Sequence, residues 1–440
     1  MKLPLSWLSD YTDMTGITPK EYDAKLTMSG SKVEEVYYLG AEIDNVVTGK
    51  ILEVVDHPDS DHLKICQLDV GKEESVQIVT GAPNVTPASV GEICPVCLHK
   101  STLPGGVKIT KGKLRGVPSN GMMCSFQELG LSHGCVPYAC ENGILFLPAG
   151  TPVGEDIKKV LGLDDWVSDF EITSNRPDCL SVIGLARETA ATFDRPFSVK
   201  TPEVKGVGDD INKYMSVEVK DTDLCPRYTA RIVKNIKIEP SPAWMRERLH
   251  ACGVRPINNI VDITNYVMMA YGQPMHCFDA DMVEGKKIVV RTQPEGTKFV
   301  TLDGEEHTLG EHDLSICNAE EPMCIAGVFG GKGSGTYDTT TNVVLESAYF
   351  HPSWIRKSAR RHGLSTDASY RFERGIDPNG TIYALKQAAI LCCQLAGGKV
   401  SMQINDVYPA PIADAQVRLD YEYCDRLIGK AIGHDMIRQI

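Results

Sequence analysis

The chain has 440 residues, which predicts about three domains, and its 42% hydrophobic and 23% charged residues are ordinary values for globular proteins. The net charge of −13 argues against a protein that simply coats nucleic acid, although a local basic patch can still bind RNA. No run is apolar enough to cross a membrane and the N-terminus lacks the apolar core of a signal peptide, so we expect a cytoplasmic protein.

The 15 cysteines are scattered and odd in number, which indicates reduced thiols rather than a disulfide framework. Cys94 and Cys97, with His99 close by, raise zinc binding as an alternative. A structural zinc site needs four ligands, and a second pair with the right spacing is missing. The other candidates in this region are Cys124, Cys135 and Cys140. We therefore expect buried thiols and no metal site.

The first predicted helix begins at Thr18, where a capping box with a proline in the first turn is present, and it ends at Gly30. Tyr22 and Leu26 supply its buried face. A strand over 33–39 should follow the helix.

From 46 to 147 short β-rich runs alternate with turns, which predicts a small closed barrel. The run from Ser119 to Ser125 resembles the closing motif of the OB-fold tRNA-binding domain. Basic side chains make this module locally positive, which suits phosphate contacts, but a solvated lysine-rich hairpin is an equal alternative. These side chains are Lys100, Lys108, Lys111, Lys113 and Arg115.

After the barrel the pattern returns to helix and loop, with an amphipathic helix from Ser181 to Phe193 and a linker over 201–208. A large central domain follows, in which strands and helices do not alternate strictly, so its class is α+β. Strands are predicted over 215–219, 227–233, 287–292 and 342–350, and helices over 243–252, 259–271, 352–362 and 379–396.

The last of these helices is the most clearly marked. Asp377 caps it, Pro378 occupies its first turn, and Gly397 ends it. Its apolar face is Ala384, Leu385, Ala388, Leu391, Cys392 and Leu395. A new pattern over 412–440 reads as the beginning of a further domain whose core is not completed.

The stretch from Gly253 to Asp279 contains more polar groups than core packing requires. A helix over 259–271 ends at Gly272, and a loop stiffened by Pro274 then carries the imidazole of His276. The polar groups interleaved with this apolar stretch are Arg255, Thr264, Asn265 and His276.

Three further segments belong with this stretch. The glycine-rich run 327–333 lacks the spacing of a phosphate loop, so we expect a turn where the backbone approaches a ligand closely. Glu346 ends an apolar strand, and composition alone would leave it unremarkable. The run 353–375 is rich in arginine and aromatic residues, which fits either single-stranded RNA ends or local ion pairs with Asp367 and Glu373.

The order of these segments resembles the editing region of bacterial phenylalanyl-tRNA synthetase β subunits, over nearly the whole chain. The resemblance implies a multidomain α+β fold in which an OB-fold β-barrel is inserted into a discontinuous N-terminal domain and a larger mixed α+β editing (B3/B4-type) domain follows. The implied ranges are 1–39 with 152–198 for the N-terminal domain, 40–151 for the barrel, 209–407 for the editing domain and 412–440 for the start of a truncated B5-type domain.

By the same resemblance, His276 and Glu346 are the catalytic candidates of an editing pocket. The substrate-binding candidates are Arg255, Thr264, Pro274, Gly330, Thr366 and Ala368. The tRNA-binding candidates are Lys108, Lys111, Lys113 and Arg115 in the barrel, with Arg360 and Arg361 in the arginine-rich run. Cys277 suggests a cysteine hydrolase instead, but neither a second catalytic histidine nor an asparagine is identifiable for that mechanism.

The resemblance also implies a function and partners. The family attaches phenylalanine to tRNA(Phe) with ATP and Mg²⁺ on a partner α subunit in an (αβ)₂ heterotetramer, and this chain itself would bind neither cofactor. This chain would bind tRNA and hydrolyse mischarged Tyr-tRNA(Phe). The alternative is a non-catalytic module that docks tRNA and holds the α subunit. A cavity shared by His276 and Glu346 would favour hydrolysis, and separate solvent faces would favour the module.

Overall fold

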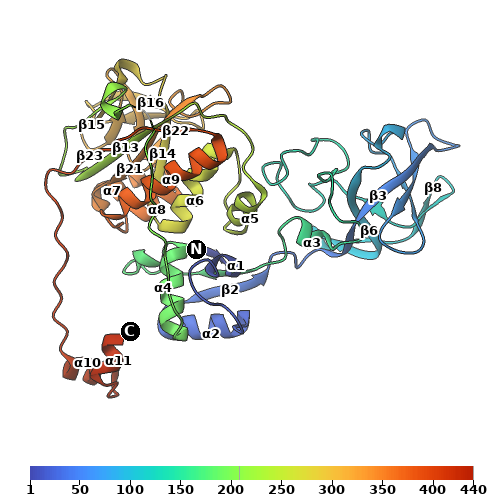
Figure 1. The fold of residues 1–440 in the computed structure, drawn as a ribbon, viewed down its shortest axis with the longest axis horizontal. Helices are drawn as coiled ribbons and strands as arrows, with labels where there is room; N and C mark the ends of the chain where they lie inside the picture. Colours follow the sequence, from blue (N-terminus) through green and yellow to red (C-terminus); the bar gives the residue numbers. More distant parts are fainter. Residues whose placement is uncertain (208, 440) are drawn as a thin grey trace.

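The computed structural model describes residues 1–207 and 209–439. Gly208, the last residue of the predicted linker, and Ile440, the last residue of the predicted final segment, lie outside the described residues. Figure 1 shows a small N-terminal part, a β-rich part to one side of it and a larger mixed part above it, which confirms the multidomain α+β class. None of the helices in the described ranges is both long and apolar enough to cross a membrane.

The N-terminal part is built from two distant stretches of the chain. Its antiparallel sheet has the order β1-β11-β2, with β1 at Lys2–Pro4, β11 at Trp166–Phe170 and β2 at Val33–Tyr38. The central strand therefore comes from beyond the whole β-rich part (Figure 1). Its helices are α1 (Leu5–Leu8), α2 (Pro19–Ser29), α3 (Ile157–Val160) and α4 (Val182–Phe193).

The predicted helix signals of this part are confirmed. The Thr18 side chain accepts a hydrogen bond from the Glu21 N–H at 3.2 Å and so caps α2. Gly30 ends α2 with a left-handed φ of 110°, which glycine adopts without steric cost. Ser181 caps α4 by accepting from the Gly184 N–H.

The β-rich part is a six-stranded antiparallel sheet that curls into a half-barrel. Its order is β10-β6-β3-β4-β5, with β7 paired to β6. The segment before β10 approaches the far edge of the sheet, since the Asn120 N–H donates to the Gln77 carbonyl of β5 at 2.8 Å. The strands are β3 (Asp44–Asp56), β4 (Lys64–Asp69), β5 (Val76–Thr80), β6 (Ile93–Leu103), β7 (Val107–Ile109) and β10 (Met122–Met123), with a separate hairpin of β8 (Gly112–Leu114) and β9 (Val117–Ser119).

The large part contains two main sheets that pack face to face. One has the order β14-β21-β13-β22 with β23 also on β13, and the other has the order β12-β15-β18-β19-β20. The first sheet comprises β13 (Arg227–Lys234), β14 (Met275–Asp279), β21 (Asn342–Tyr349), β22 (Lys399–Val400) and β23 (Asn405–Val407). The second comprises β12 (Ser216–Val219), β15 (Lys287–Thr292), β18 (Leu314–Cys317), β19 (Pro322–Ile325) and β20 (Phe329–Gly330), and β16 (Thr297–Val300) pairs with β17 (Glu306–Leu309) beside it.

Strand β21 is buried on both faces, which explains its continuous apolar run. Val343 and Leu345 pack with helices α6 and α9, whereas Val344 and Ala348 face the second sheet. The helices of this part are α5 (Ala243–Ala251), α6 (Asn259–Tyr271), α7 (Pro352–His362), α8 (Asp367–Phe372) and α9 (Gly380–Ala396).

Two local predictions are wrong. The structure places His276 inside strand β14 and not in a loop, because the chain re-enters the sheet at Met275, directly after Pro274. The predicted cap Asp377 accepts from the Asn379 N–H in the turn before α9, so that helix begins at Gly380. At the other end of the chain, α10 (Tyr421–Ile428) and α11 (His434–Gln439) have no buried residue among those described.

Candidate functional site

The site begins with the pairing of β14 and β21. In this antiparallel pair His276 lies directly opposite Glu346. Directly opposed side chains lie on one face of the sheet with Cβ atoms about 5 Å apart. That face is the one that packs on the second sheet, since the neighbours Phe278 and Val344 belong to the core between the sheets. Cys277, one residue along, lies on the other face in the core around α6 and α9, so it does not share the site.

A cavity of about 230 Å³ lies against this pair. Six of the residues predicted from the sequence line it together: Pro274, His276, Gly330, Glu346, Thr366 and Ala368. The rest of the wall is mainly apolar and includes Leu302, Ile316, Val328, Phe350 and Phe372. Phe350 and Phe372 pack edge to face, with ring centroids 5.0 Å apart. The cavity is therefore an apolar hollow with a few polar groups, as is typical of small-ligand sites.

Two polar atoms on the cavity wall have no internal partner. Within the described ranges, neither Nε2 of His276 nor Oε2 of Glu346 makes a hydrogen bond, and both atoms are buried. The Glu346 side chain belongs to a residue that is only 4% exposed. Because a buried polar group without a partner costs roughly 1–3 kcal/mol, two such atoms side by side indicate groups kept for a ligand.

Burial also sets the charge of these two groups. It lowers the pKa of His276 to about 4 and raises the pKa of Glu346 to about 8, because the charged form of each loses its hydration. Both side chains are therefore neutral near pH 7. A neutral carboxyl can accept a hydrogen bond through one oxygen and donate one through the other, and a neutral imidazole can do the same through its two nitrogens.

The raised carboxyl pKa gives a test by protein stability. Between its ordinary value of 4.5 and about 8, folded Glu346 keeps its proton whereas the unfolded chain releases it. The contribution of this group to stability is therefore full below pH 4.5 and is lost as the pH rises, by at most about 1.4 kcal/mol per pH unit. Glu346→Gln cannot ionise at this position and does not lose this contribution. The free energy of unfolding of the variant minus that of the parent should therefore increase as the pH rises from 5 to 8. Urea denaturation at four pH values measures the gain, and a pH-independent difference would refute the assignment.

Gly330 leaves room for both the imidazole and the ligand. A Cβ built at this position would lie 2.7 Å from Cδ1 of Leu302 and 3.2 Å from Cε1 of His276. The backbone of β20 can thus lie this close to the cavity only because position 330 has no side chain. This agrees with the predicted turn of close backbone approach.

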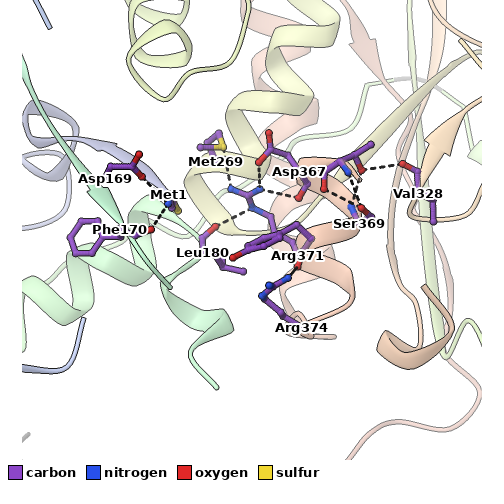
Figure 2. Close-up of polar contacts among 12 residues, drawn as sticks. Met1, Asp169, Phe170, Leu180, Met269, Val328, Asp367, Ser369, Arg371 and Arg374 are labelled. Atoms are coloured by element: carbon purple, nitrogen blue, oxygen red, sulfur yellow. Dashed lines mark hydrogen bonds and ion pairs between the residues drawn. The ribbon is translucent and has the colours of Figure 1, made fainter. Parts of the chain in front are cut away.

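Helix α8 forms another wall. The Thr366 side chain caps it by accepting from the Ser369 N–H at 3.0 Å, and its hydroxyl donates to the Val328 carbonyl at 3.1 Å. Figure 2 shows this link between α8 and the segment that precedes β20. Ala368, two residues further, supplies only a methyl group, which leaves space for a ring.

Two predicted residues lie elsewhere. Among the described residues that line the cavity, neither Arg255 nor Thr264 is present. Thr264 lies on α6, where its hydroxyl donates to the Val261 carbonyl, and Arg255 is exposed in the loop before that helix. The structure does not bring these two residues to the pair of His276 and Glu346.

Some wall residues were missed at the sequence level. Phe350 and Phe372 lie within the runs that were singled out, and their aromatic character was the available signal. Leu302 lies in the turn between β16 and β17 and carried no signal, since its role depends on the packing of that hairpin against β20.

The basic candidates of the β-rich part are all exposed, and they divide into two groups. Lys108 and Lys113 line a groove of about 730 Å³ on the curled sheet. Lys111, which lies between them in the sequence, and Arg115 are not part of the described lining of that groove. The Arg115 guanidinium donates to the Asp59 carbonyl at 2.8 Å.

Three arginines of the run 353–375 form ion pairs within the chain. Arg361 pairs with the buried Asp313 at 2.6 Å, Arg371 with Asp367 at 3.0 Å, and Arg374 with Glu373 at 2.7 Å. Arg360 is exposed on α7. The alternative of local ion pairing therefore holds for Arg371 and Arg374, whereas the partner of Arg361 is distant in the sequence.

The prediction of buried thiols is confirmed for Cys94, Cys97 and Cys124, whereas Cys135 is partly buried and Cys140 is exposed. All cysteines are free thiols, and Cys94 and Cys97 belong to different cores because residues three apart on a strand point to opposite faces. Within the part of the chain that the structure describes, one group of metal-type ligands lies close together: Asp178, Cys179 and Glu188. The Arg176 guanidinium donates to all three, so a fixed cation already occupies their centre and the group does not fit Mg²⁺.

Two family models match the chain. Residues 46–156 match the putative tRNA binding domain and residues 224–397 match the B3/4 domain. The curled sheet with its basic groove lies in the first range, and the cavity of His276 and Glu346 lies in the second. The fold and site therefore define a chain that joins a tRNA-binding domain to a B3/4 domain.

Curated relatives are named phenylalanine–tRNA ligase β subunit. Those of Clostridium acetobutylicum, Clostridium tetani and Bacteroides fragilis are 50%, 45% and 44% identical, each over 100% of this chain and 54% of their own length. The chain belongs to the family of phenylalanine–tRNA ligase β subunits. It spans about half the length of the curated relatives that it matches.

Proposed function

We propose that the cavity binds the tyrosine of mischarged Tyr-tRNA(Phe) and that its ester bond to the tRNA is hydrolysed there, with His276 and Glu346 as the catalytic pair. The observation that carries the proposal is the placement of the unpartnered Nε2 of His276 and Oε2 of Glu346 on one apolar cavity. An apolar cavity of about 150 Å³ is enough to hold benzene, so about 230 Å³ is enough for a phenol ring.

The chemistry of selection explains why such a cavity is needed. A hydrophobic site for phenylalanine rejects a side chain that merely adds a hydroxyl by only about a hundredfold. A second site can do better if it recognises the hydroxyl itself, because phenylalanine would then leave its polar groups without partners. The neutral carboxyl of Glu346 can accept a hydrogen bond from the phenol and donate one to it, without a buried charge.

His276 acts on the attacking water. An aminoacyl ester is already activated, so its hydrolysis chiefly needs a water held near the carbonyl carbon. A general base works best when its pKa is close to the working pH, and the pKa of His276 is about 4. Nε2 therefore orients the water by a hydrogen bond, and orientation is favoured over full deprotonation.

Deacylation assays test the proposal. The chain is incubated with Tyr-tRNA(Phe) and with Phe-tRNA(Phe), and the loss of each ester is followed. We expect the tyrosyl ester to be hydrolysed at least about tenfold faster than the phenylalanyl ester, as one well-placed hydrogen bond allows. Equal hydrolysis of the two esters, or none of either, would contradict the proposal.

We also infer that the β-rich part is an OB-fold that binds tRNA. Its curl, the bond from Asn120 to Gln77 and the basic groove support this inference. Lys108 and Lys113, which line that groove, are the first candidates for phosphate contacts. Lys111 and Arg115 of the same part, and Arg360 on α7 of the large part, are further candidates.

Removing the two groove lysines should weaken tRNA binding and make it less dependent on salt. In the double variant Lys108→Ala with Lys113→Ala, the magnitude of the slope of log affinity against log salt concentration should fall by about 1.5–2. Each lost phosphate contact lowers that slope by about one unit. Lys20→Ala with Lys25→Ala on α2 is the control of equal charge. Slopes that match in the two double variants would count against the groove.

For the complete protein we propose the β-subunit role in phenylalanine–tRNA ligase. The ligase would charge tRNA(Phe) in the cytoplasm with ATP and Mg²⁺ on an α subunit, within an (αβ)₂ assembly. We place the domain boundaries at 1–39 with 152–198, 40–151, 209–407 and 412–440. The pairing of β1 and β2 with β11 supports the discontinuous first domain. The shared cavity favours hydrolysis over a purely tRNA-docking module.

A further inference from the structure

Arg371 is a buried arginine on the side of α8 that faces away from the cavity. Its residue is 2% exposed, and its guanidinium contacts three segments of the chain. Nε donates to the Leu180 carbonyl at 3.1 Å, Nη1 to Oδ1 of Asp367 at 3.0 Å, and Nη2 to the sulfur of Met269 at 3.2 Å. Figure 2 shows the guanidinium between these groups. Arg371 therefore links α8 to α6 and to the segment that leads into α4.

The other side of α8 forms the cavity. Ala368 and Phe372, one turn apart, line it, and the capping residue Thr366 bonds to Val328 on the opposite wall. Asp367 and Arg371 are one turn apart as well, on the side toward Leu180. This six-residue helix is thus a wall with the cavity on one side and the N-terminal part on the other.

The packing between α8 and the N-terminal part is incomplete, although Ala368 contacts the hydrophobic core that includes Leu180. A second cavity, of about 360 Å³, lies between them and is lined by residues of both sides, including Met1, Leu180, Cys252, Met269, Asp367 and Arg371. A buried guanidinium is costly unless its donors are satisfied. The arrangement that satisfies Arg371 therefore selects one position of α8 relative to Leu180.

We propose that Arg371 is a positioning residue for discrimination between amino acids: by tying α8 to the Leu180 carbonyl, it sets the width of the cavity of His276 and Glu346. The N-terminal part of the chain is then a component of substrate selection. This inference rests on the proposed hydrolysis of Tyr-tRNA(Phe). Loosening α8 widens the ring site, so the tyrosyl and phenylalanyl esters come to be handled more alike.

The test compares the rates for the two esters in each variant. In Arg371→Met we expect the ratio of Tyr-tRNA(Phe) to Phe-tRNA(Phe) hydrolysis, measured as kcat/KM, to fall by about 5- to 10-fold, as 1–1.4 kcal/mol of lost selectivity requires. Arg371→Lys keeps the charge but loses the forked set of N–H donors. Its ratio of Tyr-tRNA(Phe) to Phe-tRNA(Phe) hydrolysis should therefore lie between that of the parent and that of Arg371→Met. A merely structural defect lowers the active fraction, which reduces both rates equally and leaves the ratio unchanged.

The matched control is Arg231→Met. Arg231 is also a buried arginine, 3% exposed, and it also donates to a backbone carbonyl, that of Ser401. Its neighbour Ala230 lies opposite Glu346 in the adjacent strand and so is on the cavity face of β13. Successive side chains of a strand point to opposite faces, so Arg231 lies on the face away from the cavity. We expect Arg231→Met to lose stability and to keep the parental ratio.

The outcomes separate the two proposals. A parent that hydrolyses the tyrosyl ester selectively, with an unchanged ratio in the Arg371 variants, overturns the positioning role alone. A parent without selective hydrolysis overturns the proposed function and this inference with it. If Arg371→Met does not fold, the ratio of Tyr-tRNA(Phe) to Phe-tRNA(Phe) hydrolysis in Arg371→Lys and Asp367→Asn tests the positioning role. The Asp367 side chain is 62% exposed, so its substitution leaves the core intact, and a ratio equal to the parental one in both variants refutes the inference.

Discussion

Substituting His276 by alanine should lower the rate of Tyr-tRNA(Phe) hydrolysis at least about 100-fold, which is the lower range for the loss of a positioned acid–base or water-orienting group. The reason is geometric, since the unpartnered Nε2 lies on the cavity wall beside Glu346. Alanine removes this atom and leaves the apolar wall around it. Single-turnover deacylation near pH 7 measures the effect directly.

The pH dependence of the parent adds a second readout. Because burial lowers the pKa of His276 to about 4, its imidazole is neutral from pH 6 to 8, so its contribution to the rate should be constant there and fall below about pH 5. His307→Ala is the matched control. His307 is also partly buried with an unpartnered Nε2 among the described residues, but it lies on β17 and outside the cavity lining. Equal rates for His276→Ala and His307→Ala would remove His276 from the mechanism.

Gly330→Ala should lower Tyr-tRNA(Phe) hydrolysis by about 5- to 160-fold, as expected if 1–3 kcal/mol of overpacking at the site raises the barrier by the same amount. The added methyl would lie 2.7 Å from Leu302 and 3.2 Å from the His276 ring, so the imidazole or the hairpin must shift. The methyl would also take up space that the ring of the substrate needs. The affinity for uncharged tRNA should stay at the parental value, because the basic groove is in another part of the chain.

Gly335→Ala is the control on the same segment. A Cβ at that position has its nearest neighbour, Cδ2 of Leu302, at 3.7 Å, which is an ordinary contact. Gly335→Ala should therefore hydrolyse the tyrosyl ester at the parental rate. If Gly330→Ala retains that rate as well, the cavity beside His276 is not where the ring binds.

Local signals explain which parts of the fold were predictable. Helix α6 was predicted over its observed range, because its apolar residues are periodic and Gly272 supplies a left-handed stop. In the structure Asn258 caps its first turn. Helix α7 was likewise predicted over its observed range, and α9 differs only by one residue at its start. Each of these features depends on residues within one or two turns of one another.

The site required information that local patterns do not contain. The register that sets His276 opposite Glu346 joins strands about seventy positions apart, and only the family resemblance paired them. Their neutral state follows from burial between two sheets, which no residue pattern reports. The pairing of Arg361 with Asp313 was hidden for the same reason, since Asp313 lies 48 positions earlier in the chain, just before strand β18.

The most direct test of the central claim measures binding without hydrolysis. Adenosine carrying tyrosine or phenylalanine on a 3′-amide in place of the ester cannot be cleaved, and calorimetry gives its affinity for the cavity. We expect the parent to bind the tyrosyl compound about 3- to 10-fold more tightly than the phenylalanyl compound, and Glu346→Leu to bind the two equally. Equal affinities in the parent would contradict the claim that the cavity of His276 and Glu346 recognises the phenol hydroxyl.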